Sequence, residues 1–198
     1  TTTPTPEQAF SIGYTHHQAG NTDQAQHWWE QAADAGDRRA MFGLGLLAAL
    51  ADDLDQARNW SQQAADAGHS GAMFYLGVLA SNAGELDQAR HWYQQAADAG
   101  DGDAMFNLGV FADDDGDLNQ ARHWYHQAAE TGHGRAMFNL GLLAAQAGDT
   151  DEALHWYHQA AETDDGRAMF NPGVLTEPQG CLGQVRHRWT RARRRRTR

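Results

Sequence analysis

Residues 104–130 read AMFNLGVFADDDGDLNQARHWYHQAAE, and much of this stretch recurs along the chain at a fixed step of 32 residues. The tripeptide Ala-Met-Phe begins at Ala40, Ala72, Ala104, Ala136 and Ala168. A tryptophan returns with the same step, at Trp28, Trp60, Trp92, Trp124 and Trp156. Self-similarity at this period indicates a repeat array in which each unit buries its apolar face against its neighbours. We therefore expect function on an extended surface.

Within one repeat the sequence predicts two helices joined by a short turn. Residues 103–112 are apolar on nearly all sides, as expected of an inner helix that contacts neighbours on several faces. Residues 113–117 form the turn. Residues 118–130 have apolar side chains at three- and four-residue intervals, which predicts an amphipathic outer helix. No proline occurs between Pro6 and Pro172, so these helices can run uninterrupted.

A glycine returns in every inner helix, at Gly13, Gly45, Gly77, Gly109, Gly141 and Gly173. Glycine inside a helix costs up to about 1 kcal/mol relative to alanine. Its regular return therefore predicts a packing reason. We expect the bulky Trp-Tyr pair of the outer helix to approach the inner helix where the glycine has no side chain.

These positions resemble a known repeat family. Leu108-Gly109, Ala121, Tyr125 and Ala128 are similar to the small and large positions of the tetratricopeptide repeat. The triplet Asn107-Leu108-Gly109 and the closing Ala-Asp-Ala-Gly-Asp of residues 97–101 resemble its Sel-one-like subclass. The resemblance implies a right-handed all-α solenoid of antiparallel helix pairs. Two departures are the unit length of 32 residues, against about 34 in that family, and a shorter turn between the helices.

The period divides the chain into three expected segments. Residues 1–6 are predicted to be flexible, residues 7–171 to form the repeat solenoid, and residues 172–198 to hold a degenerate sixth repeat and an Arg-rich tail. In the last segment Pro172 replaces the leucine before glycine and Arg188 replaces the tryptophan. A frayed polar cap and a disordered arm are both compatible with these changes.

The resemblance also implies a concave face lined by the inner helices. Asparagine donates and accepts hydrogen bonds, so an asparagine column could hold the backbone of an extended peptide while apolar columns take its side chains. The predicted groove residues are Phe74, Tyr75, Val78, Phe106, Asn107, Val110, Phe138, Asn139 and Leu142. The alternative is that the phenylalanines pack between adjacent inner helices and the asparagines bond nearby carbonyls.

Few sequence patterns indicate metal binding or catalysis. His123 and His126 have helical ligand spacing, but no cysteine is near, and copies in adjacent repeats should lie about 8–10 Å apart, too far for one ion. The acidic run 113–117 lacks the glycine phase and distal glutamate of a calcium loop and suits a basic partner segment better. We expect no catalytic residues, no metal and no cofactor.

Charge is divided unevenly along the chain. Residues 1–185 hold all 26 Asp and Glu but only 7 of the 15 Arg, a net charge of −19, whereas the rest carries +8. The acidic body disfavours nucleic-acid binding along its length. A basic arm is the exception, and it could contact nucleic acid, an anionic surface or another copy of the chain; its residues are Arg191, Arg193, Arg194, Arg195 and Arg196.

The sequence thus predicts a non-catalytic scaffold that binds a protein, either a peptide or a partner helix. Binding through the Arg-rich tail and a regulatory repeat module of a larger enzyme are the alternatives. No apolar run approaches the roughly 20 residues that span a bilayer. Cys181 is the only cysteine, which is compatible with a reducing cytoplasm.

Overall fold

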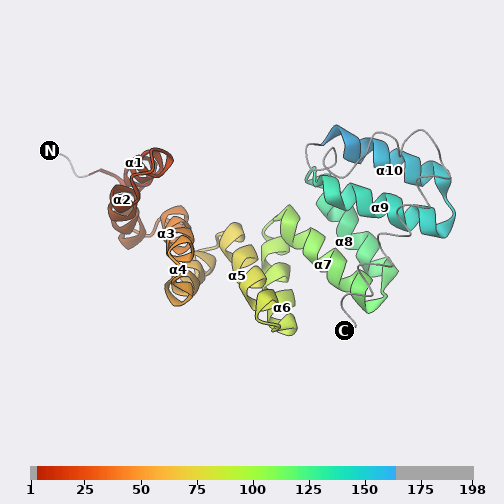
Figure 1. Ribbon diagram of the computed structural model, residues 1–198, viewed down its shortest axis with the longest axis horizontal. Coiled ribbons are helices and arrows are strands. Elements are labelled where there is room, and N and C mark those ends of the chain that lie inside the picture. The colour runs from red at the N-terminus through yellow and green to blue at the C-terminus, as the bar shows by residue number, and fades with distance from the viewer. Residues whose placement is uncertain (1–3, 164–198) are drawn as a thin grey trace. The chain divides into compact units, whose positions relative to one another are not determined.

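The computed structural model describes residues 4–163, and within that range it contains ten helices and no strand (Figure 1). The helices are α1 (Pro6–Gln18), α2 (Thr22–Asp34), α3 (Arg38–Leu50), α4 (Leu54–Asp66), α5 (Ser70–Asn82), α6 (Leu86–Asp98), α7 (Gly102–Asp115), α8 (Leu118–Glu130), α9 (Gly134–Ala147) and α10 (Thr150–Glu162). Odd-numbered helices are the inner helices of the sequence analysis and even-numbered helices the outer ones. The expected all-α fold of helix pairs is confirmed.

The chain forms two compact units, which divide between Ala104 and Met105. In the first unit, α1 packs on α2, α3 on α4 and α5 on α6, and α2 and α4 also contact the inner helix that follows. In the second unit, α8 packs on α9, and α9 packs on α10. Helices α2 and α4 therefore lie against inner helices of two successive repeats, as stacking of helix pairs requires.

Two helix boundaries differ from the sequence expectation. Helix α1 begins at Pro6, because Thr5 caps it and exchanges hydrogen bonds with Gln8. Helix α7 continues to Asp115, so three of the five residues expected in the turn are helical. The remaining turn is short, and Gly116 reverses the chain at a φ of 82°. In the second repeat Asp52 takes the same left-handed conformation, at a φ of 62°.

The helical glycines are required by close packing, as the sequence predicted. A Cβ atom built on Gly109 would lie 2.5 Å from the ring of Tyr125, a separation that real Cβ atoms do not show. Equivalent pairs are Gly13 with Trp29, Gly77 with Tyr93 and Gly141 with Tyr157. The second aromatic of each of these outer-helix pairs therefore rests directly on the inner helix of its own repeat.

The second repeat departs from this rule. Ser61 stands where the other described repeats have an aromatic residue, and its Oγ lies 2.8 Å from the Cβ position of Gly45. The side chain is fully buried and its Oγ has no hydrogen-bond partner. A buried hydroxyl without a partner costs about 1–3 kcal/mol. The second repeat thus carries a cost in folding free energy at the position where the other outer helices rest on the inner helix of their own repeat.

We predict that Ser61→Ala raises the stability of the first unit. The substitution removes the partnerless hydroxyl and keeps nearly the same shape, so the free energy of unfolding should rise by about 1 kcal/mol. Ser81→Ala is the matched control, because the Ser81 hydroxyl is hydrogen-bonded to Tyr93 and its loss should destabilise. Urea unfolding followed by circular dichroism measures both. A loss of stability in Ser61→Ala would show that the hydroxyl is bonded after all.

Candidate functional site

The residues predicted to line a groove lie on α5, α7 and α9, but they are unequally accessible. Phe106 is 6% exposed and Leu142 is 8% exposed, so both present little area to a ligand. The other seven are partly buried: Phe74, Tyr75, Val78, Asn107, Val110, Phe138 and Asn139. The predicted set therefore combines two core residues with seven that are partly accessible.

The phenylalanine rings contact the outer helices of their own repeats. Ring centroids are 5.7 Å apart for Phe74 and Tyr93, 5.8 Å for Phe106 and Tyr125, and 5.5 Å for Phe138 and Tyr157. Such offset and tilted contacts add to the energy of burial. These pairings were not anticipated from the sequence, and they give each phenylalanine a packing role within its repeat.

Asn139 also has a partner within the fold. Its side chain is hydrogen-bonded to the hydroxyl of Tyr125 in the preceding repeat. Burial, reinforced by the nearby Asp113 carboxylate, raises the pKa of Tyr125, so this hydroxyl stays neutral at physiological pH. Part of the hydrogen-bonding capacity of Asn139 therefore ties two repeats together and is not available to a ligand.

The residue type at the repeat position of Asn139 differs between inner helices. It follows the size of the outer-helix residue in the preceding repeat. Gly43 fits under Trp29, because a Cβ atom there would lie 2.9 Å from the indole ring. Where the preceding residue is Ser61, the position holds Tyr75, whose ring also contacts Phe42 at 6.4 Å. The pairs are Trp29 with Gly43, Ser61 with Tyr75, and Tyr125 with Asn139. A large residue on one helix thus accompanies a smaller one on the other.

We predict that Tyr125 and Asn139 are energetically coupled. Tyr125→Phe and Asn139→Ala should each cost about 1 kcal/mol, and the double variant little more than either one, because both remove the same hydrogen bond. A double-mutant cycle from urea unfolding gives the coupling. Asn119→Ala, at an exposed position of α8, is the control and should change little. Strictly additive losses would contradict a shared bond.

The most exposed apolar side chains of the inner helices lie in the first unit. Tyr14 on α1 is 49% exposed, and Leu46 and Leu50 on α3 are 40% and 78% exposed. Tyr14 and Leu46 occupy the same repeat position as Val78, and Leu50 is one helical turn beyond Leu46. We call Tyr14, Leu46 and Leu50 the apolar face.

A signal for the apolar face is present in the sequence, although none of its residues is among the predicted groove residues. At the repeat position of Leu50, the other described repeats have polar residues, namely Gln18, Asn82, Asp114 and Gln146. Leu50 is thus the one apolar residue in an otherwise polar column of residues 4–163. Burial within the fold does not account for this residue, because Leu50 is 78% exposed at the end of α3.

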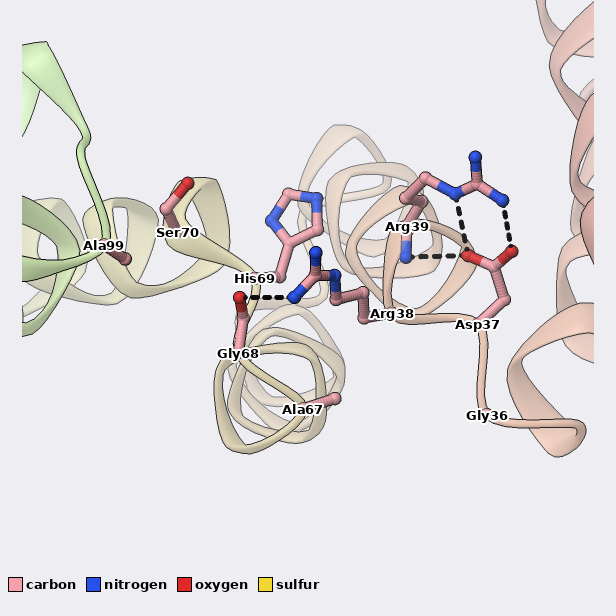
Figure 2. Close-up of a pocket in the computed structure, with 9 residues that line it drawn as sticks. All are labelled: Gly36, Asp37, Arg38, Arg39, Ala67, Gly68, His69, Ser70 and Ala99. Atoms are coloured by element: carbon pink, nitrogen blue, oxygen red, sulfur yellow. Dashed lines mark hydrogen bonds and ion pairs between the residues drawn. The ribbon is translucent and has the colours of Figure 1, made fainter.

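A polar pocket of about 830 Å³ lies where α3 and α5 begin (Figure 2). Asp37 caps α3 and forms an ion pair with Arg39 at 2.7 Å. Arg38 donates to the carbonyl oxygen of Gly68 at 2.9 Å, and the ring of His69 lies beside it (Figure 2). Asp37 thus caps the start of α3, His69 caps the start of α5, and Arg38 bonds to the turn before α5.

The histidines that the sequence analysis considered as metal ligands lie on the outer helices. His123 is exposed, and its ring meets Trp124 edge-on at 5.6 Å. Within residues 4–163 no three His, Cys, Asp or Glu side chains are placed to hold a metal ion. In the same range no helix has the length and apolar character needed to cross a membrane. The predicted basic arm, Arg191 to Arg196, lies outside the described residues.

The stacked helix pairs define an all-α helical-repeat protein. The chain belongs to the tetratricopeptide repeat family, whose model matches residues 10–72, 76–132 and 106–168. No curated protein matches it.

Two solved structures extend this likeness. A Sel1 repeat protein from Oxalobacter formigenes has a TM-score of 0.73 and 27% identity, over 96% of this chain and 87% of that one. The protective antigen c5321 of uropathogenic Escherichia coli, which has an SLR fold, has a TM-score of 0.70 and 25% identity over 79% of this chain. That match spans only 38% of the antigen.

A third solved structure shares the fold alone. YrrB, a tetratricopeptide repeat protein with an unusual peptide-binding site, is 20% identical with a TM-score of 0.51, over 78% of this chain and 84% of that one.

Proposed function

We propose that this protein is a non-catalytic scaffold that binds a segment of a protein partner on the inner-helix face of its first unit. The observation that carries the proposal is the apolar face, where Leu50 leaves 78% of its surface in water. Membership of a repeat family that generally serves as interaction scaffolds supports it. The partly buried groove residues Phe74, Tyr75 and Val78 would extend the contact along α5.

The apolar face provides a driving force for binding. Burial of apolar area contributes about 25 cal/mol per Å², so covering one leucine side chain gives roughly 1.5–3 kcal/mol. Leu46 and Leu50 are one turn apart on α3, which is held in place by packing on α4. Binding would therefore cost little conformational entropy beyond that of fixing the two side-chain rotamers. Two leucines and the ring of Tyr14 can therefore act as anchors for apolar side chains of a partner.

Charge next to the apolar face defines the partner further. The α3–α4 turn carries the exposed residues Asp52 and Asp53, and Asp55 follows in α4. Acidic groups beside an apolar surface favour a partner that places basic residues next to its apolar ones. We therefore propose an amphipathic, basic segment as ligand, in the form of an extended peptide or a helix. The cytoplasm is the proposed compartment, with the single cysteine as its support.

We predict that Leu46→Ser combined with Leu50→Gln abolishes binding without loss of stability. Both side chains are exposed, and Gln occurs at the position of Leu50 in other repeats, so the fold should tolerate both changes. Affinity for a partner recovered by affinity capture, measured by calorimetry, should fall at least tenfold, because truncated anchors typically cost above 1 kcal/mol each.

Leu86→Ser is the matched control, since Leu86 is 50% exposed but begins the outer helix α6. It should leave the affinity unchanged. Full binding by the double variant would contradict the apolar face as the site. If that binding were then lost on deleting residues 186–198, the Arg-rich tail would be the binding element instead.

A further inference from the structure

The residues that cap the inner helices α3, α5, α7 and α9 alternate between aspartate and histidine. Asp37 accepts a hydrogen bond from the backbone N–H of Ala40 at 3.3 Å, and Asp101 accepts one from Ala104 at 2.9 Å. His69 stands at the position of Asp37 in the next repeat, and His133 stands at the position of Asp101 in the next repeat. In these repeats a histidine Nδ1 accepts from the N–H of Ala72 or Ala136, at 3.2 Å in both cases.

The two kinds of cap respond differently to acid. A histidine Nδ1 can accept a hydrogen bond only when the ring is neutral, because both ring nitrogens carry protons in the charged form. A protonated ring would also place positive charge at the positive end of the helix dipole. A carboxylate keeps its acceptor oxygens and its favourable charge down to about pH 4. Acidification therefore removes a histidine cap and leaves an aspartate cap in place.

Each histidine cap is also a contact between repeats. The His69 ring lies on Phe42 of the preceding inner helix, with centroids 4.7 Å apart. The His133 ring stacks on Phe106 in the same way, at 4.7 Å and an interplanar angle of 17°. Since the same ring caps one helix and packs on another, a change in its hydrogen bonding is transmitted to the packing between two repeats.

We infer that His69 acts as an acid-sensitive clamp, which holds α5 to α3 when neutral and releases the first turn of α5 when protonated. The device is independent of the proposed binding function, since it concerns only the contacts between repeats. It gives the junction between α3 and α5 a response to pH that the junction capped by Asp37 lacks.

The surroundings of His69 set where this response falls. Burial lowers the pKa of His69, and the Arg38 guanidinium lowers it further, while Asp37 opposes this shift and Arg39 adds to it (Figure 2). These charged groups all come from the start of α3. Because the pKa is lowered in the folded protein, the stabilisation from neutral His69 is complete above its usual pKa near 6.5. It is lost as the pH falls through the lowered value.

Hydrogen exchange at single-amide resolution on the full chain tests the clamp at pH 7.5 and at about one pH unit below the midpoint of the His69 ring, with rates corrected for intrinsic exchange. An NMR titration of the wild type locates that midpoint. Protection of the Ala72 and Met73 amides in the wild type should fall about fivefold at the lower pH, the effect of losing one helix cap. His69→Asp, which introduces the same cap as Asp37, should abolish this fall. The Ala40 and Met41 amides of α3, which follow Asp37, are the internal control and should stay constant.

Equal losses at α3 and α5, or the same loss in His69→Asp, would overturn the inference, because the effect would then be global. A second measurement needs no variant. In an NMR titration of the wild type, the Ala72 amide shift should follow the midpoint of the His69 ring. An Ala72 amide that stays constant while His69 titrates would refute the clamp.

Discussion

The contact between a glycine of the inner helix and the outer-helix side chain above it governs the structure. At Gly109 there is no room for even a methyl group beneath Tyr125, so the two helices approach as closely as backbone and ring permit. This approach lets each outer helix present alanines, such as the fully buried Ala121 and Ala128, to its neighbours. The short side chains keep successive helix pairs close, and a core forms from a chain with few large aliphatic residues.

This contact could be predicted from the sequence because it depends only on position in the repeat. A helical glycine and a bulky pair that both return every 32 residues are accounted for most simply by packing against each other. The pairing of Phe106 with Tyr125, or the bond between Asn139 and Tyr125, depends on the rotation of one helix against the next. The period does not encode that rotation. The period does not encode the exposure of each side chain either. Leu142, which was predicted in the groove, is buried, whereas Leu50 is exposed.

The second repeat shows how the array absorbs a change at its central contact. Ser61 leaves the space that an aromatic ring fills elsewhere, and the Phe42 ring contacts His69 and Tyr75 of the next repeat. Tyr75 is the largest residue in its column among the described repeats. Volume lost on an outer helix is thus matched by volume gained on the next inner helix, as dense packing demands. The departure at Ser61 is therefore accompanied by a second departure, at Tyr75.

Leu50 departs from the repeat without such compensation. Burial does not account for Leu50, an apolar residue in a polar column, because 78% of its surface faces water. His69 is different, because aspartate would cap α5 as well, and the ring adds a contact with Phe42 that aspartate could not make. Positions that keep the period build the scaffold, since every repeat needs them. Positions that break it without a compensating neighbour distinguish one repeat from the next, and a periodic scaffold can specialise only there.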